Sequence, residues 1–169
     1  VCSSDLVKLG GDNTNIHKSL NFLRAFNRGD RLNVGKHVAI VGAGNTAMDC
    51  ARAALHIPGV EKATVIYRRS QQEMPAWREE YEEALQDGVT FRFLSNPEHF
   101  AADGTLTVRA MALGEPDEQG RRRPLPTDET WTLQVDTLIT AIGEQQDGEA
   151  LAAMGIPLND HGWPEVNAD

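Results

Sequence analysis

Six residues in the first third of the sequence have the types and spacing that hold a phosphate group. Gly42-Ala43-Gly44-Asn45-Thr46-Ala47 is a G-x-G-x-x-A turn. The first glycine permits a tight bend, the second lets the backbone approach a pyrophosphate, and the small last residue lets the following helix lie close to the preceding strand. The free N–H groups at the start of that helix attract an anion. These residues therefore indicate binding of a phosphorylated ligand.

A glycine turn of this kind is informative only between a strand and a helix. Residues 36–42, KHVAIVG, form an apolar run typical of a strand covered on both faces. Beyond the turn, apolar residues recur every three or four positions until Pro58-Gly59, which predicts a helix, and residues 62–69, KATVIYRR, read as a second strand. The resulting βαβ unit, with its right-handed crossover, predicts dinucleotide binding. A glycine turn kept only for packing is the alternative.

Other phosphate-binding loops fit less well. A Walker-type loop is excluded because no G-K-[ST] ends the turn. A methyltransferase glycine loop would place an acid at the end of the second strand, and that strand ends instead in Tyr67-Arg68-Arg69. An NAD site also places Asp or Glu here, about 20 residues past the turn, to bind the ribose 2′-hydroxyl. Guanidinium groups bind a 2′-phosphate, so Arg68 and Arg69 favour NADP(H) over NAD(H). The alternative is that both are solvated charges.

The remaining segments supply the elements that position this turn. The sequence predicts helices over about 14–27 and 75–88, a strand over 89–94, an antiparallel hairpin or meander within 98–135, and a last strand over 135–143. Arg121-Arg122-Arg123 is interpreted as the solvated tip of the hairpin, and the tryptophans as packing residues. The predicted fold is α/β, a Rossmann-like parallel sheet with a small antiparallel β-meander inserted before the last strand.

Composition narrows the class of protein. A chain of 169 residues suits one domain of ordinary size, and a net charge of −9 argues against a nucleic-acid partner. No apolar run approaches the ~20 residues of a membrane span. The five histidines show no metal spacing, and no Ser-His-Asp or Cys-His arrangement can be identified. We therefore expect no metal site and no catalytic residues in this chain.

The cysteines restrict the redox chemistry that this chain could carry. Cys2 and Cys50 are far apart, and no C-x-x-C occurs. This excludes an iron–sulfur cluster, a zinc ribbon and a dithiol motif within the chain. Cys50 falls in a predicted helix and is interpreted as a small core residue. The low cysteine content is consistent with a reducing, cytoplasmic compartment.

Three stretches resemble a known family. GKHVAIVGAGNTAMDCARAAL, VIYRRSQQEMPAWREEYEEALQDGVTFRFL and DTLITAIGEQ are similar to the flavin-dependent NADPH oxidoreductases of the glutamate synthase small-subunit type. Within that family the resemblance is closest to the group named after a selenate reductase iron–sulfur subunit. It runs from about Asn13 to Asp169, and GNTAMD followed by YRR and MPA is far more specific than the glycines alone.

The resemblance implies an NADPH-binding domain inserted into an FAD-binding domain, with electrons passing from NADPH to FAD and on to iron–sulfur centres or a further redox subunit. It implies that Gly42, Gly44, Asn45 and Thr46 face the NADPH pyrophosphate and that Arg68 and Arg69 take the 2′-phosphate. Ala141, Ile142 and Gly143 would pass near the cofactor at the junction of the domains.

The resemblance also implies a division of the chain. Residues 1–35 would be a linker and helix from the edge of the FAD domain, 36–143 the NADPH-binding domain, and 144–169 a return segment toward the FAD domain. The glycine fingerprint of the FAD domain, its second segment and the iron–sulfur cysteines are absent from this sequence. We therefore expect a fragment that binds NADPH, has the rest of its own FAD domain as a partner, and does not turn over alone.

The sequence leaves two alternatives to this function. The first is a nicotinamide-nucleotide-binding regulatory module without redox chemistry. The second is a Rossmann-like fold that binds no ligand.

Overall fold

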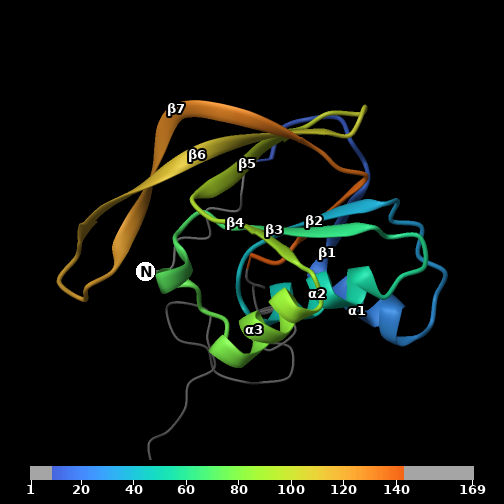
Figure 1. Cartoon of the computed structure of the whole chain (residues 1–169). Coiled ribbons are helices and arrows are strands. Elements are labelled where there is room, and N and C mark those ends of the chain that lie inside the picture. The colour runs from blue at the N-terminus through green and yellow to red at the C-terminus, as the bar shows by residue number, and fades with distance from the viewer. Residues whose placement is uncertain (1–8, 143–169) are drawn as a thin grey trace, which may run out of the picture.

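The computed structural model describes residues 9–142, which form two stacked sheets with helices against the outer face of one of them (Figure 1). The first sheet is parallel, with strand order β1-β8-β2-β3-β4. Its strands are β1 (Ile16–Lys18), β2 (His37–Val41), β3 (Lys62–Ile66), β4 (Thr90–Arg92) and β8 (Thr137–Thr140). The predicted βαβ unit is confirmed, because β2 and β3 are parallel neighbours in the register Val38↔Ala63 to Val41↔Ile66.

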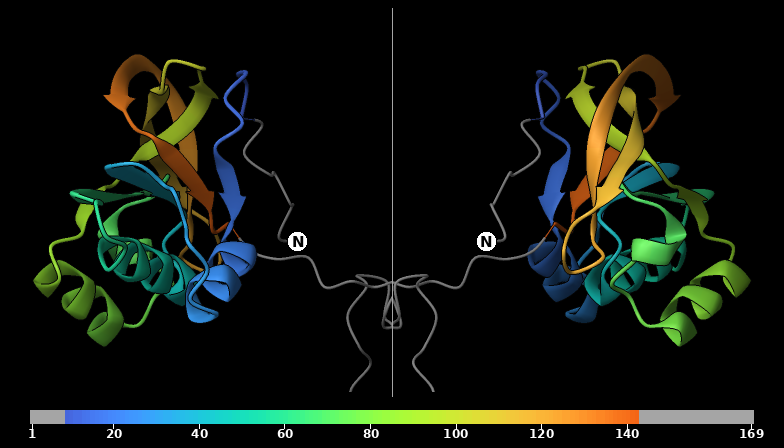
Figure 2. Two further views of the ribbon diagram at one scale, coloured as in Figure 1. Left: turned by 90° about the vertical axis from the view of Figure 1, so that its right-hand side faces the viewer. Right: turned by 90° about the vertical axis from the view of Figure 1, so that its left-hand side faces the viewer.

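Helices cover one face of the parallel sheet. They are α1 (Ser19–Asn27), α2 (Asn45–Leu55) and α3 (Arg78–Gln86), and a single 3-10 turn, η1 (Gln71–Glu73), precedes α3. Figures 1 and 2 both place the α-helices on the same side of the sheet. Phe22 of α1 and Met48 of α2 are completely enclosed there with strand residues. Cys50 belongs to this core, as predicted, and burial raises the pKa of its thiol to about 12.

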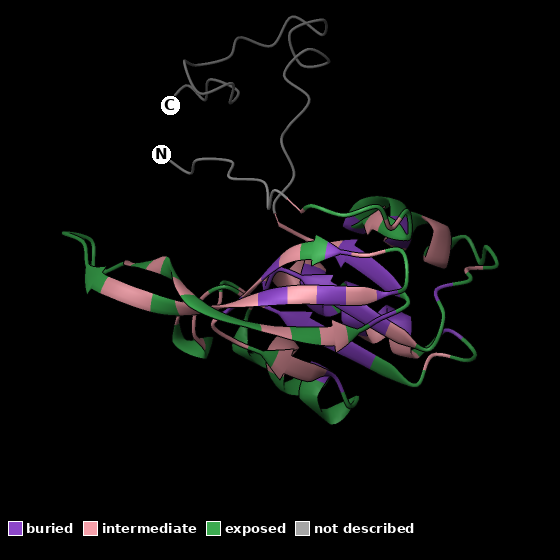
Figure 3. Cartoon of the chain, turned by 90° about the horizontal axis from the view of Figure 1, so that it is seen from above, coloured by how far each residue is buried: buried purple, intermediate pink, exposed green. Residues whose placement is uncertain are grey.

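A second, antiparallel sheet covers the other face. Its strands are β5 (Ser95–Phe100), β6 (Thr105–Pro116) and β7 (Arg122–Gln134), in that order. They precede β8 in the chain, so the predicted meander before the last strand is confirmed. Strands β6 and β7 form a long ribbon that takes in much of the polar segment 114–128, and the outer half of this ribbon consists of exposed and half-buried residues (Figure 3).

The alternation of β2 shows why this strand is apolar from Val38 to Val41. Val38 and Ile40 face the helices, whereas Ala39 and Val41 face the antiparallel sheet. A strand buried on both faces favours apolar side chains at successive positions, and the continuous apolar run of β2 follows from this.

One prediction was wrong at the start of the helix expected over 14–27. Ile16–Lys18 form β1, which adds to the edge of the parallel sheet by pairing with β8 in the register Ile16↔Leu138, and the helix begins only at Ser19. The partner strand lies about 120 residues further along the chain, so local periodicity could not reveal the pairing. Tertiary context overrides local propensity here. Within the described chain, β1 and α1 share the sheet and the core of the domain that follows them.

At the amino ends of the strands, the Asp136 carboxylate connects β8 to β2. Its Oδ2 accepts hydrogen bonds from the N–H groups of Lys36 and His37, both at 2.8 Å. These two bonds, that from His37 foremost, hold the pKa of the Asp136 carboxyl below its usual value. A lowered pKa means that this stabilisation is fully present above the unfolded-state value near 3.8 and is lost as pH falls through the native pKa.

We therefore expect Asp136→Ala to lower the free energy of unfolding by about 1 kcal/mol at pH 7, since the group is exposed and screened. The difference from the wild type should shrink below about pH 4 and vanish once the carboxyl is protonated. Urea denaturation between pH 7 and pH 3 measures it. Asp128→Ala, at an exposed aspartate of β7, is the matched control and should leave stability unchanged at each pH. A difference that is as large at pH 3 as at pH 7 would contradict the assignment.

No helix between residues 9 and 142 is long and apolar enough to cross a bilayer. Over the same range, no three His, Cys, Asp or Glu side chains gather where they could hold a metal ion.

Candidate functional site

Gly42 lies where the carboxyl ends of three parallel strands meet. Its φ is +122°, a conformation that L side chains rarely adopt, and a Cβ at this position would lie 2.3 Å from the carbonyl oxygen of Ala141. Its N–H donates to the carbonyl of Ile66 at 3.0 Å, and the N–H of Ala141 donates to the carbonyl of Val41 at 2.8 Å. Glycine is required here because the end of β8 passes directly over the turn.

Gly44 differs from Gly42 in that no protein atom requires it to be glycine. It is the N-cap of α2, with φ −85°, and a Cβ built on it would meet nothing within 4 Å. No side chain caps the helix, and its first turn contains no acidic residue. Within the described residues, no acceptor contacts the N–H groups of Asn45 and Thr46. The N-terminus of α2 therefore presents free donors and open space to an anion.

The two alanines of the turn are in contact with the core. Ala43 and Ala47 are both buried, and Ala47 is completely enclosed in the cluster between α2 and the sheet. A larger side chain at either position would push α2 away from β2, so the small residues keep the helix N-terminus beside the strand end.

Arg68 and Arg69 follow β3, the neighbour of β2, so they lie at the same end of the sheet as the glycine turn. Arg68 is exposed and Arg69 is half-buried. Among the described residues neither forms an ion pair. The Nε of Arg69 is buried without an acceptor in the described part of the chain. A buried donor without a partner is uncommon in proteins, which marks Arg69 as a candidate binding residue.

The segment after the arginines returns to the glycine turn and is fixed to it. The N–H of Ala76 donates to the carbonyl of Ala43 at 3.1 Å, and the N–H of Trp77 donates to the Asn45 Oδ1 at 2.9 Å. The Asn45 side-chain oxygen is therefore used to hold this segment, while its backbone N–H stays free. Trp77, interpreted from the sequence as a packing residue, has an exposed fraction of 68%. That interpretation was wrong, because only the backbone of Trp77 is anchored.

Arg122 contributes to this region although the sequence placed it at a solvated hairpin tip. Its Nε donates to the Glu73 carboxylate at 2.7 Å, and its Nη2 donates to the same oxygen. Arg121 and Arg123 fit the expectation, since both are exposed and Arg121 pairs with the exposed Asp117. Sequence reasoning missed Arg122 because its partner lies 49 residues away on another element, and no local signal reports that contact.

Of the predicted segment at 141–143, Ala141 and Ile142 follow β8 beside Gly42. Gly143 lies outside the described residues, as does the return segment 144–169. The structure thus brings the glycine turn, both arginines and the first two residues of the segment 141–143 to one end of the parallel sheet.

The sheet order and the strand–turn–helix define a Rossmann-like α/β domain. The chain belongs to the pyridine nucleotide-disulphide oxidoreductase family, whose model matches residues 2–169.

Two curated relatives and one solved structure illustrate the likeness. YgfK of Escherichia coli (strain K12) is 74% identical over 161 residues, which are 95% of this chain and 16% of YgfK. A Cereibacter sphaeroides protein named for the small chain of a glutamate synthase [NADPH] is 34% identical over 181 residues, 98% of this chain and 43% of that protein. The Mycobacterium tuberculosis oxidoreductase FprA has the same fold, with TM-score 0.77 at 16% identity, over 96% of this chain and 52% of FprA.

These comparisons confirm the resemblance to the glutamate synthase small-subunit type. They also show that the chain spans only about a sixth of the length of YgfK.

Proposed function

We propose that this chain binds NADPH at the carboxyl ends of β2, β3 and β8, as part of an FAD-dependent oxidoreductase of the cytoplasm. The observation that carries the proposal is the juxtaposition of two unsatisfied cationic features. The uncapped N-terminus of α2 offers free N–H groups and open space at Gly44, and Arg68 and Arg69 stand at the end of the neighbouring strand without ion-pair partners among residues 9–142.

Each feature suits one part of the coenzyme. The amides at the start of α2 would hold the pyrophosphate, since the helix N-terminus favours negative charge. Arg68 and Arg69 would hold the 2′-phosphate with paired N–H donors. The coenzyme of a related structure supports the choice, because FprA has also been solved in complex with NADPH, with TM-score 0.73 to this chain. At 16% identity that likeness shows the fold alone, so the residue roles rest on the geometry here.

In the complete protein, bound NADPH would supply a hydride to FAD, from which electrons would continue to iron–sulfur centres or a redox partner. The residues of this chain bind and orient the coenzyme for that transfer. Ala141 and Ile142 leave the sheet beside Gly42, which is where the chain would continue toward the FAD domain. On this proposal the contribution of these residues is to position the coenzyme.

The arginines give the sharpest test. Arg68→Ala and Arg69→Ala should each lower the affinity for NADP+ about tenfold or more, since a hydrogen bond to a charged group contributes roughly 1.5–3 kcal/mol. The affinity for NAD+ should change little, because NAD+ lacks the 2′-phosphate. Isothermal titration calorimetry with both nucleotides measures the two constants.

Arg31→Ala is the matched control, since Arg31 is an exposed arginine near the opposite end of the sheet. It should leave both affinities unchanged. If the preference for NADP+ survives the removal of both Arg68 and Arg69, the proposed phosphate site is wrong. A regulatory module would show the same binding pattern, and reduction of bound FAD by NADPH in the complete protein separates it from the oxidoreductase.

A further inference from the structure

Glu73 places a carboxylate close in the chain to the two arginines that are proposed to bind a phosphate. It lies four residues after Arg69, in the segment that runs from the arginines back to the glycine turn. Its side chain has an exposed fraction of only 15%. Hydrogen bonds from Ser70, and then the Arg122 guanidinium, hold the pKa of the Glu73 carboxyl below its usual value, so the group is ionised at neutral pH. A negative charge here would oppose the binding of a 2′-phosphate unless it is neutralised.

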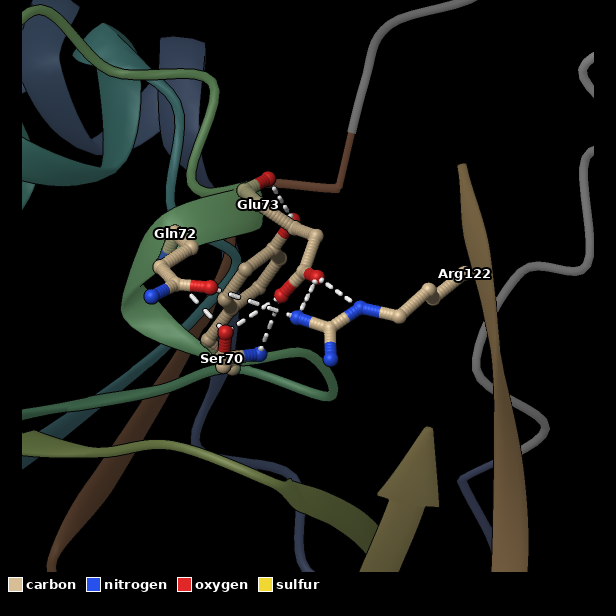
Figure 4. A network of polar contacts seen from close by, with 5 residues as sticks. Ser70, Gln72, Glu73 and Arg122 are labelled. Atoms are coloured by element: carbon tan, nitrogen blue, oxygen red, sulfur yellow. Dashed lines mark hydrogen bonds and ion pairs between the residues drawn. The ribbon is translucent and has the colours of Figure 1, made fainter. Parts of the chain in front are cut away.

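The contacts of Glu73 close the segment into a compact loop (Figure 4). The N–H of Ser70 donates to Glu73 Oε2 at 3.1 Å, and the Ser70 hydroxyl donates to the same oxygen. The hydroxyl of Tyr67 donates to the backbone carbonyl of Glu73 at 2.8 Å. Both ends of the pair Arg68-Arg69 are therefore tied to one residue, and the position of Glu73 sets the course of the backbone that carries the arginines.

The neutralising charge comes from the other sheet. Arg122, at the first residue of β7, reaches across to Glu73 Oε1 with its Nε at 2.7 Å and with its Nη2, which also lies 3.4 Å from Gln72 Oε1 (Figure 4). Leu94 makes a second connection between the layers. Its N–H donates to the carbonyl of Arg69 at 3.0 Å, and its own carbonyl accepts from the N–H of Met111 of β6 at 2.8 Å.

The backbone conformation of Leu94 indicates that its surroundings fix this connection between the two sheets. Leu94 is the one non-glycine residue with positive φ among those described, at +49°. A leucine in this conformation is unfavourable by itself and persists only when its surroundings determine it. The antiparallel layer is thus attached to the arginine loop at two points, once through the backbone of Leu94 and once through the Arg122–Glu73 ion pair.

We propose that Arg122 is a positioning residue for coenzyme selection: by binding the Glu73 carboxylate, it keeps that charge from Arg68 and Arg69 and leaves both guanidinium groups available for a 2′-phosphate. The inference rests on the proposed function of the arginines. It assigns part of the discrimination between NADPH and NADH to the inserted antiparallel sheet, which would not itself touch the coenzyme.

The charge relation predicts how each variant should behave. In Arg122→Ala the Glu73 carboxylate loses its partner, and the nearest cations along its own loop are Arg68 and Arg69, so binding of the phosphate must compete with an internal ion pair. Replacing Glu73 by glutamine removes the competing charge while keeping its shape. The defect of Arg122→Ala should therefore be relieved by Glu73→Gln, which distinguishes charge control from loss of a structural contact.

The experiment measures the affinities for NADP+ and NAD+ by calorimetry in the full 169-residue chain. Arg122→Ala should weaken NADP+ binding about tenfold and leave NAD+ binding nearly unchanged. Arg122→Lys, which keeps the charge, should retain part of the NADP+ affinity. The double variant Arg122→Ala/Glu73→Gln should recover most of it, and Glu73→Gln alone should bind NADP+ at least as well as the wild type. Thermal denaturation of each variant shows that folded protein is compared.

Three results would overturn the inference. Equal losses for both nucleotides would show a structural role, no recovery in the double variant would show that Arg122 contacts the phosphate itself, and weaker NADP+ binding by Glu73→Gln would show that the carboxylate is required. If Arg122→Ala does not fold, Glu73→Gln and Arg122→Lys still decide. If Arg122→Ala is without effect while Arg68→Ala and Arg69→Ala weaken NADP+ binding, this inference fails and the proposed function stands. If all three are without effect, the proposed function fails.

Discussion

Gly42→Ala is expected to lower the free energy of unfolding by about 3 kcal/mol or more, because two unfavourable effects combine at one atom. The backbone there has φ +122°, and the added Cβ would lie 2.3 Å from the carbonyl oxygen of Ala141. That oxygen belongs to the backbone at the end of β8, so it cannot move aside as a flexible side chain would. Urea denaturation measures the loss, and coenzyme binding should fail with the fold.

Gly44→Ala is the matched control two residues away, with the opposite expectation. Its φ of −85° is ordinary, and a Cβ there meets nothing within 4 Å. Stability should fall by no more than about 1 kcal/mol, since alanine is a poorer N-cap than glycine. NADP+ and NAD+ binding should both weaken strongly, because the methyl group enters the space through which a pyrophosphate would approach the α2 amides. A Gly44→Ala chain that binds both nucleotides normally would contradict the proposed site, and a stable Gly42→Ala chain would contradict the geometry of the turn.

The contrast between these two glycines shows what the sequence could predict. The G-x-G-x-x-A spacing, the apolar run before it and the helical periodicity after it are local signals, and β2, α2 and β3 follow from them. The sequence also predicts that both glycines matter. It does not show that the neighbour of Gly42 is Ala141, about 100 residues away in the chain. That contact depends on β8 lying between β1 and β2, which no local pattern reports.

The same limit separates the predicted site residues from the missed ones. Arg68 and Arg69 could be singled out because they directly follow a recognisable strand. Arg122 could not be singled out, because its partner Glu73 lies on another element. An arginine in a polar hairpin usually lies in solvent. Asn45 was chosen for its place in the motif, and only the structure shows that its side-chain oxygen holds the N–H of Trp77.

The inserted sheet connects stability to the site. It covers the parallel sheet face opposite the helices, with Phe100, Leu106 and Val108 packed against Ala39, Val41, Ile66 and Leu138. The same sheet carries Arg122 to Glu73 and is joined through Leu94 to Arg69. An insertion that only filled the exposed face of the sheet would need the first set of contacts and not the second.

Phe100→Ala tests the first set of contacts. Phe100 ends β5 with an exposed fraction of 1%, in the core between the two sheets. Truncating a buried phenylalanine to alanine destabilises a protein by about 3–5 kcal/mol, through lost burial and the cavity left behind. We expect a loss of that size in urea denaturation. Leu125→Ala is the control, since Leu125 lies on β7 of the same sheet with an exposed fraction of 46% and should cost well under 1 kcal/mol.

Phe100→Ala and Leu125→Ala together also test whether the packed antiparallel sheet is needed to hold the loop that carries Arg68 and Arg69. The N–H of Phe100 donates to the carbonyl of Gly10 at 2.9 Å, and the carbonyl of Phe100 accepts from the N–H of Asn13 at 3.2 Å. Neither backbone hydrogen bond involves the phenylalanine ring. The strand should therefore stay in place while the core loosens. If Phe100→Ala costs as little as Leu125→Ala, the two sheets are not packed as one core. Arg122 would then be held near Glu73 only by their ion pair and by the backbone hydrogen bonds of Leu94. Packing between the two sheets would not fix the position of the arginine loop.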